Sequence, residues 1–504
     1  MYDDDPLPDP FEFNDVDFDD SLPSTRGRSC LSIMLTLIII VGLVFSSALT
    51  YVVYRKQEAR LLTVDVLPQS SSFVAGPTAA PATVVAVAAA PLPTPVAASS
   101  ISPAVNRIAI INQDGQIETM SPAGADRRVL TLQSDLTSFQ FPTWSSDGKQ
   151  VAIIGTRALS GAIYVLNDAA RTGSLRDYQI YYSVNEPPIY LFWSPDDQNL
   201  GFLASRPRDS LSLNVIARDG TADSHQLATG NPVYWDWSDD GRQILAHAGS
   251  RGADNTLAVI GLDGEVGADN LAIPGVFQAP GIGRDGRYWA FAEQSSGGLS
   301  SLVVVDTQTG ERSTHQQVAS TALSWSPTRD QIAFTKGAVS GHPYWGPLYV
   351  LDVATGEERV ISTRTVLAFF WSPDGRQIAF ITIANDMEDE GIYAGAMEKS
   401  RGAGRLVSLP QAQFGQGFLT LSVFDIEAEE GLRLLDFEPT IPYLAQFLPY
   451  FDQYALSHRI WSPDSRAIVL PVREESGNSI LIVPTIGGRP YPLASGDIAF
   501  WSHN

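Results

Sequence analysis

WSPDGRQIAF, residues 371–380, is the stretch that decides the fold, because copies of it recur along the chain. The intact copies are TWSSDGKQVAII (143–154), FWSPDDQNLGFL (192–203), DWSDDGRQILAH (236–247), SWSPTRDQIAFT (324–335) and IWSPDSRAIVLP (460–471). GIGRDGRYWAFA (281–292) is an eroded copy with Ile282 at the Trp position, and the sequence stops inside FWSHN (500–504). A repeat this frequent usually sets the architecture.

The spacing of the copies indicates one propeller blade per copy. Successive Trp positions lie 40 to 49 residues apart, except for one gap of 90. A period in the mid-forties with several short β-rich runs is typical of a β-propeller. We therefore expect an all-β propeller whose blades are marked by Trp144, Trp193, Trp237, Trp325, Trp371, Trp461 and Trp501.

The unit after Trp325 predicts four strands. Its apolar runs are QIAFT (331–335), LYVLDV (348–353), RVIST (359–363) and TVLAFFW (365–371), joined by turn residues. In the following turn Asp374 can accept hydrogen bonds from backbone amides, and Gly375 can adopt a positive φ without strain. The Trp is a large apolar wedge between neighbouring blades. The motif is therefore interpreted as structural.

The two ends of this region are expected to complete one blade together. NRIAII (106–111), QIETMSP (116–122) and RRVLTL (127–132) match the later strands of a unit without a first strand. IAFWSHN (498–504) supplies a first strand with nothing after it. Their pairing would close the ring and remove exposed sheet edges. The count is then eight blades of four strands, or seven if one unit is misread.

The gap of 90 residues between Trp371 and Trp461 fits either two blades or one blade with insertions. No second motif lies inside it, which favours one elaborated blade. The runs 377–383 and 420–426 are its expected second and third strands, and 384–417 is the expected insertion.

The amino-terminal part predicts a membrane anchor. Residues 1–28 form an acidic, disordered tail, and 29–54 contain no charged residue, which is long enough for a single-pass transmembrane helix. A signal peptide is the alternative for that run. Residues 55–104 are a juxtamembrane and Pro/Ala-rich spacer, and 105–504 the propeller domain. Flanking basic residues do not choose an orientation, but the spacer favours an extracytoplasmic propeller and a cytoplasmic tail at the cell membrane.

Composition excludes several kinds of site. A net charge of −23 over 504 residues argues against nucleic-acid binding. The single cysteine, Cys30, excludes disulfides and thiolate metal sites elsewhere, and the six histidines have no ligand spacing. The acidic run 385–390 could hold Ca²⁺ but lacks a recognisable loop pattern. No metal and no cofactor is predicted.

The motif WSPDG with (K/R)QIAF, followed by a strand and turn such as LYVLDVATGEE (348–358), resembles the propeller repeats of TolB-like periplasmic proteins. It is also similar to the propeller of the dipeptidyl-peptidase and prolyl-oligopeptidase family. The resemblance covers roughly 105–504 and implies the fold. Those peptidases carry a hydrolase domain with a G-x-S-x-G elbow, and no such elbow occurs here. TolB-like proteins carry an extra amino-terminal domain, where this chain has the predicted span and spacer.

In a four-stranded antiparallel blade, the first-to-second and third-to-fourth turns lie on one face of the disc, the motif-turn face. The second-to-third connections and the blade links lie on the other, the long-connection face. The long segments are 178–192, 337–347, 384–417 and 437–460, and all belong to the second face. Their candidate partner-binding residues are Tyr181, Tyr182, Tyr190, Tyr344, Trp345, Tyr393, Glu398, Arg401, Tyr443, Phe447, Tyr450, Phe451 and Tyr454.

These loops suggest a binding function, since function concentrates in loops on rigid scaffolds and Tyr, Trp and Arg are favoured interface anchors. We predict a membrane-anchored, non-enzymatic scaffold that binds a partner protein or a cell-envelope component through the long-connection face. The opposing interpretation is that the aromatic side chains fold inward and pack their own loops. A hydrolase or lyase acting on peptides or sugars in the propeller channel, or a small-ligand sensor, are the alternative functions.

Overall fold

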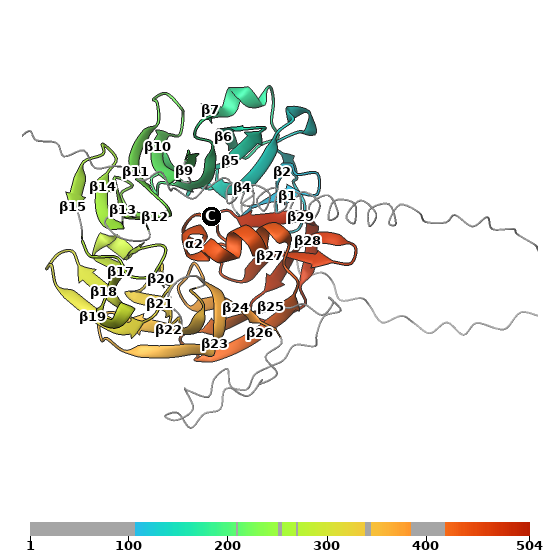
Figure 1. Ribbon diagram of the computed structural model, residues 1–504. Helices are drawn as coiled ribbons and strands as arrows, with labels where there is room; N and C mark the ends of the chain where they lie inside the picture. Colours follow the sequence, from blue (N-terminus) through green and yellow to red (C-terminus); the bar gives the residue numbers. More distant parts are fainter. Residues whose placement is uncertain (1–105, 208–209, 250–254, 269–270, 338–343, 385–418) are drawn as a thin grey trace, which may run out of the picture. The chain divides into compact units, whose positions relative to one another are not determined.

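The computed structural model describes residues 106–504 except 208–209, 250–254, 269–270, 338–343 and 385–418. The described residues belong to one compact unit. The described part is built mainly from antiparallel sheets arranged around a centre, as in a propeller (Figure 1). The predicted all-β class with four-stranded sheets is confirmed.

Four of the sheets have four strands each, hydrogen-bonded in chain order. Their strands are β4 (Ser138–Trp144), β5 (Gln150–Arg157), β6 (Ser160–Asn167), β7 (Gln179–Ser183); β8 (Pro188–Trp193), β9 (Asn199–Arg206), β10 (Ser210–Ala217), β11 (His225–Gly230); β12 (Val233–Trp237), β13 (Gln243–Ala248), β14 (Thr256–Gly261), β15 (Val266–Ala268); and β16 (Gly281–Ile282), β17 (Tyr288–Gln294), β18 (Ser300–Asp306), β19 (Arg312–Val318).

A seven-stranded sheet follows in the chain. Its strands are β20 (Leu323–Trp325), β21 (Gln331–Thr335), β22 (Gly346–Asp352), β23 (Glu358–Trp371), β24 (Gln377–Ile383), β25 (Leu419–Asp425) and β26 (Glu430–Phe437). The 14-residue β23 pairs with β22 through its first half and with β24 through its second, so that two four-stranded units share it. The sequence predicts two strands there, at 359–363 and 365–371.

The sixth sheet joins the two ends of the described chain. Its strands are β27 (Ala467–Glu474), β28 (Gly477–Pro484), β29 (Tyr491–Trp501), β1 (Ile108–Asn112), β2 (Ile117–Met120) and β3 (Arg128–Val129). The second half of β29 pairs antiparallel with β1, in a register that places Ile108 opposite Trp501. The last strand therefore supplies the inner edge on which the first strands are built.

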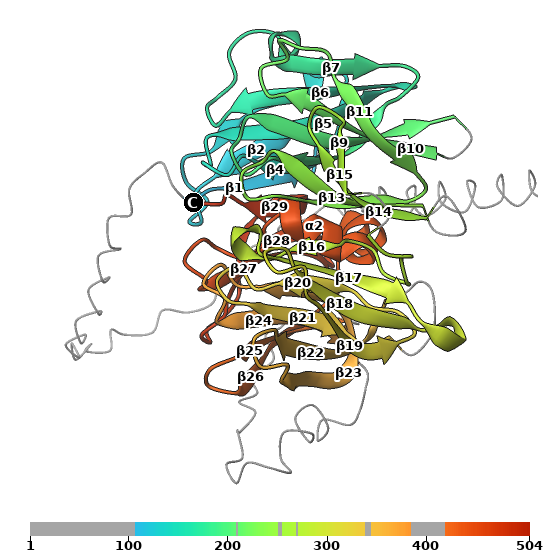
Figure 2. The same ribbon diagram turned by 90° about the vertical axis from the view of Figure 1, so that its left-hand side faces the viewer.

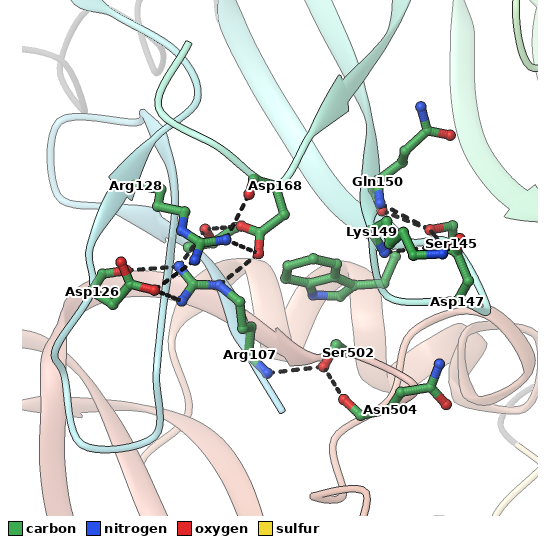
Figure 3. A network of polar contacts seen from close by, with 12 residues as sticks. Arg107, Asp126, Arg128, Ser145, Asp147, Lys149, Gln150, Asp168, Ser502 and Asn504 are labelled. Atoms are coloured by element: carbon green, nitrogen blue, oxygen red, sulfur yellow. Dashed lines mark hydrogen bonds and ion pairs between the residues drawn. The ribbon is translucent and has the colours of Figure 1, made fainter. Parts of the chain in front are cut away.

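A polar network fastens these two ends to each other and to the neighbouring sheet (Figure 3). The backbone amide of Arg107 donates to Ser502 Oγ at 2.9 Å. The buried Arg107 guanidinium makes ion pairs with Asp126 at 2.8 Å and with Asp168 at 2.7 Å, and Asp168 lies directly after β6. Arg128 NH1 reaches the same Asp168 carboxylate at 2.6 Å. The Arg107 side chain thus joins the β2–β3 turn to the residue after β6, while its backbone amide joins the carboxyl-terminal end.

The repeated turns share one geometry, shown by Ser372 to Gln377. Ser372 Oγ donates to Asp374 Oδ1 at 2.6 Å and accepts from the amide of Gln377 at 2.9 Å. Gly375 has a φ of +67°, and a side chain there would also collide with Thr328. A left-handed residue is needed at this position because the turn must reverse within a few residues.

The motif tryptophans connect neighbouring sheets around the ring. In four copies the indole Nε1–H donates at 3.1 to 3.2 Å to the carbonyl that precedes the Trp position of the preceding repeat around the ring. These bonds run from Trp144 to Phe500, Trp193 to Thr143, Trp371 to Ser324 and Trp461 to Phe370. A buried indole N–H needs such a partner. The bond therefore fixes the register between adjacent sheets.

Helical structure in the described residues is short. Turns of 3-10 helix are η1 (Gln133–Asp135), η2 (Leu175–Tyr178), η4 (Arg284–Gly286) and η5 (Ser296–Gly298). A longer helical run comprises η6 (Tyr443–Phe447), η7 (Leu448–Tyr450) and α2 (Phe451–Ser457). We refer to 441–458 as the central segment, because α2 lies in the middle of the ring in Figure 1 and between the sheets in the side view of Figure 2.

Within residues 106–504, apart from the gaps given above, the structure has no helix long and apolar enough to cross a membrane. The predicted tail, span and spacer at 1–28, 29–54 and 55–104 lie outside the described residues, and so do the predicted insertion and the acidic run 385–390. The single-pass anchor remains a prediction.

Candidate functional site

The central segment fills the middle of the ring with aromatic side chains. Phe447 is fully buried, and its ring lies 5.5 Å from that of Phe500 on β29 and 5.7 Å from that of Phe370 on β23. Tyr454 lies 5.1 Å from Phe141 on β4 and 5.1 Å from Tyr190 on β8. Strands far apart around the ring thus pack on one short helical run.

Polar contacts hold α2 in the same place. Gln453 accepts from the amide of Trp235 at 2.8 Å and donates to its carbonyl at 2.9 Å, as a neighbouring strand residue would. The Tyr190 hydroxyl donates to the Gln453 carbonyl at 2.9 Å, and Thr143 Oγ1 donates to the carbonyl of Ser457 at 2.8 Å. Buried polar groups require such partners, and here β4, β8 and β12 provide them. The segment is therefore part of the core.

This placement corrects part of the predicted binding surface. Five of the candidate side chains are buried in the core, because the central segment and the inner strands bury their aromatic faces against each other. They are Tyr190, Tyr443, Phe447, Phe451 and Tyr454. For these five the inward-packing interpretation holds. The predicted loop 178–192 also differs, since β7 and β8 take up most of it.

The remaining candidates are distributed differently. Tyr182, Trp345 and Tyr450 are exposed, while Tyr181 and Tyr344 are half-buried. Tyr393, Glu398 and Arg401 lie outside the described residues.

Exposed apolar side chains gather on the long-connection face. A residue lies on this face if it belongs to a connection between the second and third strands of a unit, to a link between two units, or to the strand end next to either. Twelve of the fifteen exposed large apolar residues in the described chain meet this condition. They are Leu132, Leu136, Leu159, Tyr182, Val184, Ile189, Ile273, Trp345, Ile383, Ile441, Leu444 and Tyr450. Val266, Ile486 and Tyr491 lie in or just after third-to-fourth turns, toward the motif-turn face. The long-connection face therefore carries most of the exposed large apolar side chains and is the candidate interaction surface.

A cavity of about 420 Å³ lies between the central segment and the motif turns. Its lining includes Asp236 at the end of β12 and Asp452 on α2, and both carboxyls are more than nine-tenths buried. Asp236 accepts hydrogen bonds from the amides of Trp237 and Ile282, each at 2.8 Å. Asp452 accepts from the amides of Gln453 at 2.9 Å and Ala279 at 3.3 Å.

Burial decides the protonation of these two carboxyls. Removal from water disfavours the charged form and raises the pKa of Asp236 and of Asp452 to about 7 each, against an ordinary 3.8, although the backbone amides oppose this shift. No basic side chain pairs with either group among the described residues. Such groups can exchange a proton near neutral pH.

The sequence contained a signal for Asp236 that the prediction did not use. Asp236 stands directly before the motif Trp, where the other intact copies have Thr143, Phe192, Ser324, Phe370, Ile460 and Phe500. A carboxylate at an inward position of one copy alone indicates a site. Asp452 has no comparable signal, because its segment is not repeated. In the described residues no group of three or more His, Cys, Asp and Glu is placed to hold a metal ion.

We expect Asp452→Asn to gain stability relative to the wild type as the pH rises from 5 to 8. The raised folded-state pKa means that the folded protein holds this proton more tightly than the unfolded chain. The stabilisation of the folded state by this bound proton is complete below pH 3.8 and is lost as the pH rises through about 7. One proton changes the free energy of unfolding by ~1.4 kcal/mol per pH unit between pH 5 and the folded-state pKa. Because the group is only partly protonated near that pKa, the stability difference between variant and wild type should shift by roughly 1–2 kcal/mol.

Urea unfolding at both pH values measures that shift. Burial lowers the pKa of His458 and of His503 to about 3, so these two histidines make the folded protein more stable as the pH rises from 5 to 6.5. This effect is present in both proteins, and the difference between variant and wild type therefore removes it. Asp240→Asn is the control, since the Ser238 hydroxyl lowers the pKa of this exposed carboxyl, which stays ionised throughout the range. Equal pH dependence in both variants would show that Asp452 titrates normally.

The chain is similar to several solved structures. A structure described as TolB from Agrobacterium tumefaciens aligns over 51% of this chain and 88% of its own, with 18% identity and a TM-score of 0.33. TolB from Acinetobacter baumannii aligns over 69% and 81%, with 14% identity and a TM-score of 0.32. A structure from work on two prolyl endopeptidases aligns over 73% of this chain and 50% of its own, with 10% identity and a TM-score of 0.44.

These structures represent both families that the repeat resembles, so the predicted resemblance is confirmed. With TM-scores below 0.5, they carry no argument about function. No protein-family model and no curated protein matches the chain.

Proposed function

We propose that this protein is an eight-bladed propeller, held at a membrane by its amino-terminal part, that binds a partner protein through the long-connection face. The observation that carries the proposal is the concentration of exposed apolar side chains on that face. A core-like centre supports it, because a rigid ring with a filled middle presents its loops in fixed positions.

The blade count follows from dividing the shared strands. The seven-stranded sheet gives two units of four if β23 serves both, and the six-stranded sheet divides in the same way at β29. The second division leaves one unit without a first strand, and Trp461, which forms a bridge to Ile468 on β27, takes that position. With the four separate sheets this gives eight units.

The position of the chain's entry supports the choice of face. Asn106 precedes β1 at the motif-turn face, where its amide donates to the carbonyl of Asn504 at 2.5 Å. The first described residue therefore lies on the motif-turn face, opposite the proposed binding surface.

The test compares two pairs of substitutions in the full-length protein in mild detergent. Trp345→Ser with Tyr450→Ser removes two exposed aromatic side chains from the long-connection face. Ile486→Ser with Tyr491→Ser removes two exposed apolar side chains from the other side. We expect the first pair to reduce recovery of a co-purifying partner at least tenfold, because buried aromatic anchors dominate interface energies, while the second pair leaves it unchanged.

Unfolding temperatures of both pairs should stay near the wild-type value, since all four side chains are exposed. Partner recovery that is equal in both pairs would exclude the long-connection face. Binding of an envelope polymer rather than a protein would retain the face and change the partner class. Deletion of 384–417 asks separately whether the segment between β24 and β25 contributes to the same binding.

A further inference from the structure

A second cavity, of about 500 Å³, opens beside the sheet β4–β7 and shares no lining residue with the central one. Arg157 at the end of β5 and Arg176 in η2 form two of its walls. Tyr164 on β6 and Tyr182 on β7 form an aromatic side, and Asp135 lies at the margin. The residues come from three stretches of chain, 134–137, 155–164 and 174–182, that the fold brings together.

The shape of this cavity has a local cause. Residues 134–137 lead into β4, whose first residue Ser138 pairs with Thr156 on β5, so they lie beside this end of β5 and line the cavity. Gly155 lets them approach closely, because a Cβ there would come within 2.7 Å of both Thr137 and Tyr164.

The charge of the cavity is opposite to that of the chain. Arg157 and Arg176 make no ion pair within the described residues, although the whole chain carries −23. The one carboxylate of the lining, Asp135, is already occupied, since Arg171 contacts it at 2.9 Å and the amide of Leu132 donates to it at 2.8 Å. Two cationic side chains are therefore left available to a ligand.

Both arginines are exposed and line the same cavity, together with the Tyr164 phenol. Burial, followed by the charge of Asp135, raises the pKa of that phenol, and the positive charges of Arg176 and Arg157 oppose this rise. The two cations therefore come to one opening from β5 and from η2.

We propose that this cavity binds an anionic sugar, with Arg157 and Arg176 holding its carboxylate or phosphate. Guanidinium groups recognise both anions through paired N–H donors. The hydroxyl and amide groups of Ser134, Ser174 and Gln179 suit the hydroxyls of a sugar, and the exposed Tyr182 ring offers an apolar face. A volume of about 500 Å³ lies in the range of small-molecule sites.

The experiment is isothermal titration calorimetry of the full-length protein in detergent with glucuronate, glucose 6-phosphate and glucose. We expect saturable binding of at least one anionic sugar and at least tenfold weaker binding of glucose. The anionic sugar should bind at least tenfold more weakly to Arg157→Gln with Arg176→Gln, and more weakly at higher salt. Glucuronate and glucose 6-phosphate distinguish a carboxylate ligand from a phosphate ligand.

Arg218→Gln with Arg242→Gln is the matched control, because it removes the same two charges from exposed positions outside the cavity. Retained binding in this control and loss in the cavity variant would support the proposal. No anionic sugar binding to the wild type, equal binding of glucose, or equal loss in the control would each overturn it. None of these outcomes depends on the partner proposed above.

Discussion

Replacing Phe447 by Ala is expected to lower the free energy of unfolding by about 3–5 kcal/mol, the range for truncating a buried aromatic side chain. The ring is fully buried and lies 4.9 Å from that of Tyr443 and 5.4 Å from that of Tyr454. It also contacts rings on β23 and β29. The surrounding strands are held in register around the ring and cannot move in to fill the cavity that the substitution leaves. The loss of stability should therefore include the full free-energy cost of that cavity.

Urea unfolding at fixed pH measures this effect, and Leu444→Ala is the control. Leu444 belongs to the same segment but is exposed, and its replacement should change stability by less than about 1 kcal/mol. If the Phe447 variant fails to fold, Phe447→Leu keeps most of the volume and should be intermediate. Similar small losses at both positions would contradict a central segment that fills the ring.

Replacing Arg107 by Ala is expected to destabilise the protein by about 3 kcal/mol. Its side chain is 3% exposed, and that of its partner Asp168 is 7% exposed. Removing one member of a buried ion pair leaves a carboxylate in a poorly solvated place, at a typical cost of 3–5 kcal/mol. Arg128 still contacts Asp168 at 2.6 Å, so we expect the lower end of that range.

Thermal unfolding of Arg107→Ala and of Lys149→Ala provides the comparison. Lys149 pairs with Asp147 at 2.9 Å, but its side chain is 78% exposed, and exposed pairs contribute 0–1 kcal/mol. Asp168→Asn in the Arg107→Ala background should recover part of the loss, because it removes a buried carboxylate that has lost one of its two arginine partners. A loss that matches that of the Lys149 variant would show that the Arg107 ion pairs in Figure 3 do not stabilise the junction between the first strands and the sheet β4–β7.

Local patterns in the sequence were sufficient for the strands and turns. The run QIAFT coincides with β21, because alternating apolar residues between turn signals specify a strand without knowledge of distant residues. Gly375 has the expected positive φ for the same local reason. Where the prediction split β23 into two strands, Ser362 to Arg364 gave a weak apolar pattern, but pairing with β22 resumes at Val366 after a register shift, so that one strand spans both runs.

The central segment shows what a local reading lacked. Tyr443, Phe447, Phe451 and Tyr454 follow one another at intervals of four, four and three residues, which is the spacing of one helical face. That pattern could have predicted a helix with a buried side. It could not tell which surface the helix covers, because the inner strands that receive it come from the whole ring.

By itself the sequence determined the repeating unit, the four strands within it and the turn that joins the first two. These depend on residues that are close along the chain, where hydrophobic alternation and backbone preference act directly. The tertiary structure alone decided which aromatic side chains are available at the surface, that Asp236 and Asp452 lie in one cavity, and that Arg157 and Arg176 face another. Burial and charge at those points depend on residues tens to hundreds of positions apart, and only the closed arrangement of the sheets sets those distances.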